Sequence, residues 1–323
     1  MDRRRALKRA ALAAAILSLH AAPAWAAYPE RSVRIVVSLP PGSGADTTAR
    51  FIARHLTQAL GQPFVVENRP GANSFIAAKA VADSAPDGYT MFVASNSPMV
   101  TNAAVFRQLP YDPSKDFAPV TGIARFAMVI VVPAASKFRT LQELVAGARG
   151  APGRLNYAAG TPTYQVAMEL FHERNGIRSN AIPYKGTGPA VTDVAAGNVD
   201  YTIAEISSVL PLIRAGRLRA VAVASAERLK DLPDVPTVAE SGTPGFEAHA
   251  WTGGYFPARV PVAIVQRVGD AVRAALTGPE GVAFIESLGG TPFAGTPDQL
   301  RDFQAAEIAA TRRVVQSANI PVE

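Results

Sequence analysis

The 323-residue sequence contains no cysteine and only four histidines, and both shortages exclude chemistry. Without cysteine the chain has no disulfide bond, no catalytic thiolate and no cysteine-ligated metal site. The histidines are far apart, so the His-x-x-x-His spacing with which a helix binds zinc is absent. We therefore interpret His55, His172 and His249 as surface or packing residues, and we expect neither a metal nor another cofactor.

The motifs of several large enzyme classes are also missing. The sequence has no Gly-x-Ser-x-Gly nucleophile elbow and no Gly-Lys-Ser/Thr phosphate loop. Gly42-Ser43-Gly44 follows an expected strand, as a dinucleotide-binding loop would, but Thr47 stands where the third glycine belongs. No histidine has an acid–base partner nearby in the sequence. These absences favour a binding protein over an enzyme.

A membrane-spanning segment is missing as well, and the one apolar run lies in an export signal. Residues 1–26 contain a basic start, an apolar run at 10–19 and the pattern Ala24-Trp25-Ala26, which is typical of a secretory signal peptide cleaved near Ala26. This predicts a periplasmic protein. A retained anchor helix is the alternative, but the run is shorter than the roughly 20 residues that span a bilayer. The start Arg3-Arg4-Arg5 leaves both the general and the twin-arginine export routes open.

Cleavage of this segment removes most of the positive charge. The whole chain has 32 basic and 26 acidic residues, and residues 1–26 carry five of the basic ones and Asp2. The mature chain keeps 27 basic and 25 acidic residues, a net charge of +2. A nucleic-acid-binding protein usually has a clustered basic stripe, and none follows residue 27. We expect a small-molecule ligand, no nucleic-acid partner, and a monomer.

Short β-branched runs alternate with helical patterns, which indicates an α/β fold with parallel sheets and crossover helices. The pattern restarts near the middle of the chain, so we expect two lobes. The chain would cross between them near 121–128 and 247–254, which assigns 27–125 plus 252–323 to lobe 1 and 126–251 to lobe 2. A chain that crosses twice forms a hinge, and a hinged cleft closes on its ligand. Strands are predicted at 33–37, 64–67, 89–94, 128–132, 155–158, 199–203, 218–224 and 250–256.

A strand, a loop rich in Gly, Ser and Thr, and a helix start follow one another five times. One helix is predicted to open at Asp46 and another near Ser74, with Asn73 as its N-cap. Each junction presents free backbone N–H groups and the positive end of a helix dipole, which attract anions. Any one of them is also an ordinary connection. Their recurrence in both expected lobes predicts an anion site at the carboxyl ends of the strands. The junctions lie at 39–46, 71–75, 95–98, 160–164 and 185–190.

Several motifs are those of one protein family. They are Arg34-Ile35-Val36-Val37, Val66-Glu67-Asn68-Arg69-Pro70-Gly71-Ala72, Pro86-Asp87-Gly88-Tyr89-Thr90, Leu109-Pro110-Tyr111-Asp112-Pro113, Pro183-Tyr184-Lys185-Gly186 and Leu232-Pro233-Asp234-Val235-Pro236-Thr237. Through them the chain resembles the periplasmic substrate-binding proteins of tripartite tricarboxylate transporters, also called Bug receptors. The resemblance implies a two-lobed type II periplasmic binding fold and a small organic acid or amino acid as ligand, held by backbone amides, hydroxyls and bridging waters. It also implies delivery to a membrane transporter with one large and one small subunit.

The loops expected to bind the ligand depart from the family pattern. Ser38-Leu39 stands where the family has Pro-Phe, Ser43 replaces a glycine, and the second loop reads Ala72-Asn73-Ser74-Phe75. Ala204 and Glu205 replace an Asp and an Asn, and Glu205 would add a charge able to receive an ammonium group or to repel a second carboxylate. The candidate ligand-binding residues are Leu39, Pro41, Gly42, Ser43, Asp46, Asn73, Ser74, Phe75, Ser95, Asn96, Ser97, Thr161, Thr163, Gln165, Lys185 and Glu205.

Three functions follow from these observations. The leading hypothesis is capture of a small carboxylate for uptake. The second is capture of a ligand on behalf of a sensor kinase, which the sequence does not separate from uptake. The third is an enzyme that uses the same cleft, and it lacks a visible base, nucleophile or metal set.

Overall fold

The computed structural model describes residues 28–318 and 320–323. The predicted signal peptide, residues 1–26, lies outside this part of the chain. Within it, strands and helices alternate, and ten strands join in one continuous sheet. The strands are β1 (Val33–Val37), β2 (Phe64–Asn68), β3 (Thr90–Ser95), β4 (Phe117–Pro133), β5 (Asn156–Ala159), β6 (Asn180–Pro183), β7 (Tyr201–Glu205), β8 (Leu218–Val223), β9 (His249–Pro257) and β10 (Gly290–Pro292). The helices are α2 (Gly44–Leu60), α3 (Phe75–Ala82), α4 (Asn102–Val105), α5 (Leu141–Gly150), α6 (Pro162–Asn175), α7 (Thr187–Ala196), α8 (Ile206–Arg214), α9 (Val262–Thr277), α10 (Pro279–Ser287) and α11 (Pro297–Ser317), with the short helical turns η3 (Ala72–Ser74) and η4 (Ser97–Thr101).

The two halves of the sheet have the same strand order. In the first half β1 pairs in parallel with β2 and β3, and in the second half β5 pairs in parallel with β6 and β7. Parallel neighbours need crossover connections, which α2 and α3 supply in the first half and α6 and α7 in the second. Each set of three parallel strands is flanked by one antiparallel strand. This strand is β9, next to β3, in the first half and β4, next to β7, in the second. The chain thus contains the same α/β unit twice, although its sequence shows no repeat.

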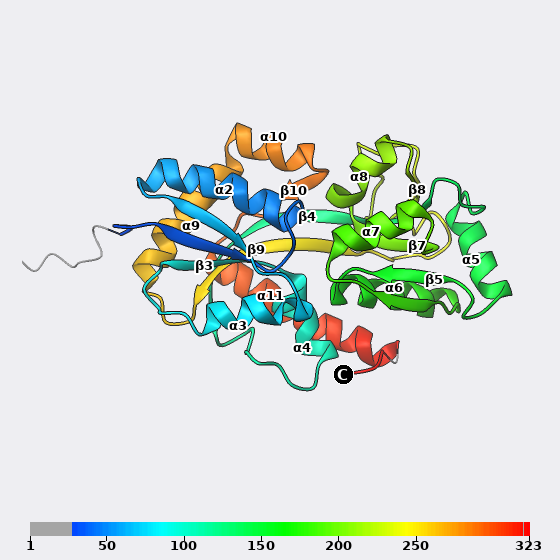
Figure 1. The fold of residues 1–323 in the computed structure, drawn as a ribbon, viewed down its shortest axis with the longest axis horizontal. Coiled ribbons are helices and arrows are strands. Elements are labelled where there is room, and N and C mark those ends of the chain that lie inside the picture. Colours follow the sequence, from blue (N-terminus) through cyan, green and yellow to red (C-terminus); the bar gives the residue numbers. More distant parts are fainter. Residues whose placement is uncertain (1–27, 319) are drawn as a thin grey trace, which may run out of the picture.

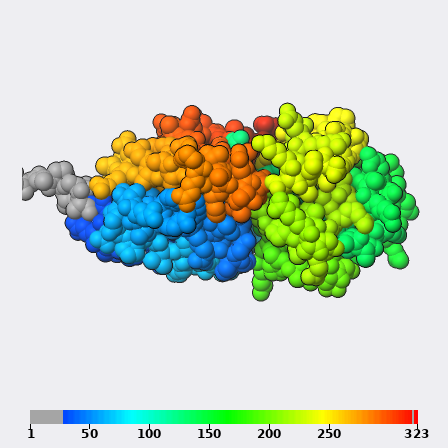
Figure 2. Space-filling view, turned by 90° about the horizontal axis from the view of Figure 1, so that it is seen from above, coloured from blue at the N-terminus to red at the C-terminus, as the bar shows by residue number. Residues whose placement is uncertain are grey.

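The strands β4 and β9 join the halves. The first part of β4 pairs with β9, and its last part pairs with β7 and β8. In Figure 1 both strands run between the two groups of helices, and Figure 2 shows the start and end of the chain (blue and orange) on one side and its middle (green) on the other. The strand predicted at 128–132 is only the last part of β4, because irregularities next to Pro119 and Gly122 break the alternation of the first part.

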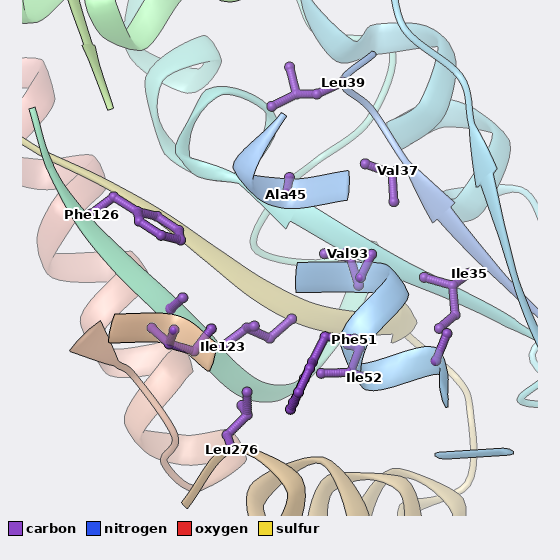
Figure 3. Packing of buried hydrophobic residues seen from close by; sticks show 14 of the residues in the cluster. Ile35, Val37, Leu39, Ala45, Phe51, Ile52, Val93, Ile123, Phe126 and Leu276 are labelled. Carbon is purple, nitrogen blue, oxygen red and sulfur yellow. The ribbon is translucent and has the colours of Figure 1, made fainter. Parts of the chain in front are cut away.

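Buried apolar side chains fix α2 against the sheet. Figure 3 shows Ile35 and Val37 of β1, Phe51 and Ile52 of α2 and Phe126 of β4 in one cluster, and all five are buried. β-Branched residues suit a strand covered on both faces, and apolar residues spaced three or four apart give a helix one buried face. This packing holds the first turn of α2 at the edge of the sheet where β1 and β3 end.

Three predicted details of secondary structure are wrong. Helix α2 begins at Gly44, before the predicted start at Asp46, because Ser43 is its N-cap. Asn73 does not cap α3: it lies in η3 with a φ of 51°, and the N-cap position belongs to Ser74. The strand predicted at 199–203 is instead β7, which begins at Tyr201 and continues to Glu205, because its pairing with β4 extends that far.

The C-terminal helices cover the first half of the sheet. Helix α9 packs against α2 and β4, and α11 packs against β4 and η4. No helix of the described residues is long and apolar enough to cross a bilayer.

Candidate functional site

A small cavity lies between the two halves, where the loops after β1, β3, β5 and β7 face one another. Its volume is about 20 Å³, which is room for about one water molecule. In open α/β sheets, ligands bind at the carboxyl ends of strands, and these loops follow such ends. The cavity is lined by Leu39, Gly44, Ala45, Ser95, Asn96, Ser97, Phe126, Thr161, Thr163, Tyr164, Glu205, Ala250, Trp251 and Thr252.

Three helices begin at this cavity. Its lining includes Gly44, the first residue of α2, Thr161, the N-cap of α6, and Glu205, the N-cap of α8. The lining holds no Lys, Arg or His side chain among the described residues. Any attraction for an anion therefore comes from backbone N–H groups and from the positive ends of the helix dipoles.

The loop between β1 and α2 is held by its own side chains. The Ser43 hydroxyl accepts a hydrogen bond from the Asp46 N–H (3.2 Å), and the Asp46 carboxylate accepts one from the Gly42 N–H (2.9 Å). Burial opposes ionisation of Asp46, but hydrogen bonds from Arg50, Gly42 and Asn68 outweigh it and lower the pKa of this carboxyl. Ser43 and Asp46 therefore shape the loop, and neither lines the cavity.

The cleft is closed by direct contacts between the halves. The Thr163 hydroxyl, at the start of α6, lies 3.0 Å from the Ser97 hydroxyl and 2.8 Å from the Thr101 hydroxyl. Gly186, with a φ of 125°, approaches Pro40 so closely that a Cβ there would lie 3.0 Å from the proline Cδ. These contacts leave the cavity its small volume.

Asn96 connects the loop after β3 to the crossing strand β9. Its side-chain amide donates to the His249 carbonyl (3.0 Å) and accepts from the Trp251 N–H (2.8 Å). Both ends of the amide are thereby occupied, so Asn96 lines the cavity mainly as a positioning residue.

Glu205 brings a carboxylate to the cavity from the end of β7. The residue is only 3% exposed, and its Oε1 accepts a hydrogen bond from the Ser208 hydroxyl (2.7 Å). Its Oε2 has no hydrogen-bond partner within the described residues. Burial raises the pKa of Glu205, while the Ser208 hydroxyl and the amides of Glu205 and Gly44 offset part of that rise.

Several residues that line the cavity are not among the ligand-binding candidates predicted from the sequence. Phe126, Ala250, Trp251 and Thr252 belong to β4 and β9, which the sequence indicated as strands and hinge crossings but not as part of the ligand site. One signal was available: Thr252 is a polar residue inside an apolar strand pattern. In the sheet it pairs directly with Ser95 of β3.

The other predicted site residues lie outside this cavity. Asn73 and Gln165 line a neighbouring cavity of about 100 Å³, to which Thr161 also belongs. Phe75 packs edge-on against Phe106 with ring centres 5.0 Å apart, and Lys185 is exposed. Seven of the candidates meet at the cavity between the halves: Leu39, Ser95, Asn96, Ser97, Thr161, Thr163 and Glu205. Neither cavity is lined by Pro41, Gly42, Ser43, Asp46, Ser74, Phe75 or Lys185.

The described residues contain no group of three His, Asp or Glu side chains suited to a metal ion. His172 instead takes part in the core of the second half. It is buried and lies 2.7 Å from the Tyr201 hydroxyl.

Comparisons with known proteins agree with this geometry. The family described as tripartite tricarboxylate transporter family receptor matches residues 48–320. BugT from Bordetella pertussis is 38% identical over 292 residues, 90% of each chain. The structure of R. palustris Rpa4515 with adipate is similar with a TM-score of 0.89 and 35% identity, over 91% of this chain and 99% of that one. MatC (Rpa3494) from Rhodopseudomonas palustris with bound malate has a TM-score of 0.84 and 32% identity, over 89% and 100%.

These similarities cover nearly all of the described residues and both halves of the sheet. They confirm the predicted two-lobed type II periplasmic binding fold, and they confirm the resemblance carried by the sequence motifs. The chain belongs to the tripartite tricarboxylate transporter receptor family.

Proposed function

We propose that this protein is a periplasmic receptor that captures a small carboxylate between its lobes and delivers it to a tripartite transporter in the membrane. The observation that carries the proposal is the start of three helices at one cavity whose lining has no basic side chain. Such helix starts bind carboxylates through N–H groups and dipoles. Rpa4515 and MatC were solved with adipate and malate, and both solutes are dicarboxylates.

Capture requires the lobes to separate. A cavity of about 20 Å³ holds one water-sized group, so a whole carboxylate enters only when the contacts of Thr163 and Gly186 across the cleft are broken. Lobe 1 comprises residues 27–125 and 252–323, and lobe 2 comprises 126–251. Hinge bending occurs in β4 and β9, which are the strands shared by both halves.

The candidate residues divide into two roles. Those that line the cavity, such as Ser95, Thr161 and Glu205, contact the solute. Those that hold the loops, such as Ser43 and Asp46, keep the helix starts in place. The protein acts as a monomer and is exported by the signal peptide at 1–26, which is removed near Ala26.

Two experiments test this function. Mass spectrometry of the solute released from the purified protein should identify a small carboxylate, and a thermal-shift panel of mono-, di- and tricarboxylates and amino acids should show stabilisation by its chemical relatives. Deletion of the gene should then abolish growth on that solute. Normal growth with loss of a transcriptional response would instead indicate a signalling receptor, and turnover of the solute by the purified protein would indicate an enzyme.

A further inference from the structure

The interlobe cavity contains three buried oxygen atoms without hydrogen-bond partners. They are Glu205 Oε2, Ser95 Oγ and Thr252 Oγ1, and the statement holds for the part of the chain that the structure describes. Glu205 and Thr252 are 3% and 4% exposed, so bulk water does not reach them. Buried polar atoms are nearly always hydrogen-bonded in folded proteins. The Trp251 Nε1, a donor that also lacks a partner, lies toward Glu307 in a different cavity. The convergence of the three oxygens on one cavity indicates a bound group that supplies the missing partners.

The three oxygens come from both lobes. Ser95 and Thr252 are directly opposite each other in the pairing of β3 with β9, which puts their side chains on the same face of the sheet. Glu205 approaches from the other lobe, at the junction of β7 and α8. The cavity between them holds one water-sized group. The partner is therefore small, and it binds to both lobes at once.

The charge of the site is unbalanced. Among the described residues that line the cavity, Glu205 is the only charged one, and Tyr164 is the only other that titrates. Arg125 is next to the lining residue Phe126 on β4, but its guanidinium lies over the rings of Phe293 and Phe303 and borders a different cavity. A buried carboxylate with no counter-ion is strongly unfavourable. The Gly44 amide offsets only part of that cost, since burial still raises the pKa of Glu205.

We propose that this cavity binds the protonated amino group of the solute, with Glu205 as its counter-ion, so that the solute is an amino acid or another aminocarboxylate. An ammonium group has three N–H donors and no acceptor, which matches three unpartnered oxygens, one of them anionic. It is also about the size of a water molecule. The proposal rests on the proposed function, since it names the class of carboxylate captured. The carboxylate of the solute then lies toward Thr161, the N-cap of α6, which the cavity shares with its neighbour of about 100 Å³.

The test uses pairs of solutes that share one skeleton and differ in the amino group: aspartate and succinate, glutamate and glutarate, leucine and 4-methylpentanoate. Isothermal titration calorimetry is done at neutral pH on the protein freed of solute, and on the variants Glu205→Gln and Glu280→Gln. The second variant is a matched control, because Glu280 is exposed and pairs with Arg54 on the surface. Wild type and Glu280→Gln should bind the amino member of at least one pair at least tenfold more tightly. Glu205→Gln should lose that preference.

Two results overturn the proposal in different ways. If wild type binds the member without the amino group as tightly or more tightly, the proposed function stands and the amino-group assignment fails. In that case Glu205 is protonated and donates to a second carboxylate, and binding strengthens as the pH falls. If no carboxylate of the panel binds, the proposed function itself fails with it. The comparison within wild type decides the matter even if Glu205→Gln does not fold.

Discussion

Thr163 joins the two lobes through its hydroxyl, and its removal should weaken the closed state. The hydroxyl lies 2.8 Å from that of Thr101 and 3.0 Å from that of Ser97, and both partners are buried in the closed cleft. Valine has nearly the same shape as threonine but no hydroxyl. Thr163→Val should therefore leave each lobe folded, and it should destabilise only the arrangement in which the lobes meet.

The size of the effect follows from the number of bonds lost. A hydrogen bond of this kind contributes about 0.5–1.5 kcal/mol, so two bonds contribute about 1–3 kcal/mol to the closed state. Open lobes expose the same hydroxyls to water, so the open state loses little. Because the proposed capture requires closure, the loss appears in the affinity and should raise Kd by about 5- to 150-fold. Thr101→Val removes one of the two bonds and should raise Kd by about two- to tenfold.

A double-mutant cycle separates closure from direct contact with the solute. Thr163 lines the cavity and Thr101 does not, so an effect of Thr163→Val alone is ambiguous, whereas coupling between the two substitutions reports the bond across the cleft. Calorimetry on wild type, both single variants and the double variant should give a coupling energy of about 0.5 kcal/mol or more. Thr192→Val is the control, since that hydroxyl is exposed and bonds only within α7. Strict additivity, or an unchanged Kd in all variants, would refute the reasoning.

Three further predictions follow from the same contacts. Burial raises the pKa of Glu205, so above the ordinary carboxyl pKa the folded protein binds more protons than the unfolded chain. The stability of the solute-free protein should therefore fall as the pH rises through that window. Thermal melts recorded across this pH range should show the fall in wild type and not in Glu205→Gln. At neutral pH this variant should be more stable by about 1–3 kcal/mol, and an unchanged pH profile would contradict the account. Gly186→Ala should weaken binding about tenfold in calorimetry, because a Cβ at a φ of 125° meets Pro40 of the other lobe, whereas Gly188→Ala, with open space around it, should bind normally. A bound solute at 100 times its Kd should stabilise the fold by about 2.7 kcal/mol, measured as a shift of the thermal midpoint, and no shift would exclude tight binding to the folded state.

The scaffold was more predictable than the site. Buried strands such as β1 have β-branched runs bounded by clear turn residues, so local pattern was enough to find them. The equivalence of the two halves is a property of pairing between distant segments, and no local pattern contains it. In the same way β4 was only partly predicted, because the residues next to Pro119 and Gly122 interrupt a strand that the partner β9 nevertheless maintains.

In the candidate site, too, residues marked by a local pattern were predicted, and residues placed by pairing between distant segments were missed. Loop residues such as Thr161 were found because a helix start has its own sequence signature. Thr252 was missed because a residue inside a strand faces the cavity only when a second strand, here β3, sets its register. Asp46 was predicted to bind the ligand because of its position after a strand. Only the hydrogen bonds that it accepts from Gly42 and Asn68 indicate that it stabilises the loop instead.

Asp46 and Glu205 indicate that affinity for anions and choice of solute have different origins in this cleft. Both carboxylates lie near the start of α2, but hydrogen bonds within one lobe keep the pKa of Asp46 low. Glu205 approaches from the other lobe and meets no cationic side chain among the described residues that line the cavity. Helix starts attract carboxylates whatever side chains surround them, since the N–H groups and dipole belong to the backbone. Under the proposed function, they therefore determine the class of ligand. The few side chains that enter the cavity would then determine which member of the class fits, so we expect exchange of Glu205 to alter the solute while the packing that forms the helix starts stays intact.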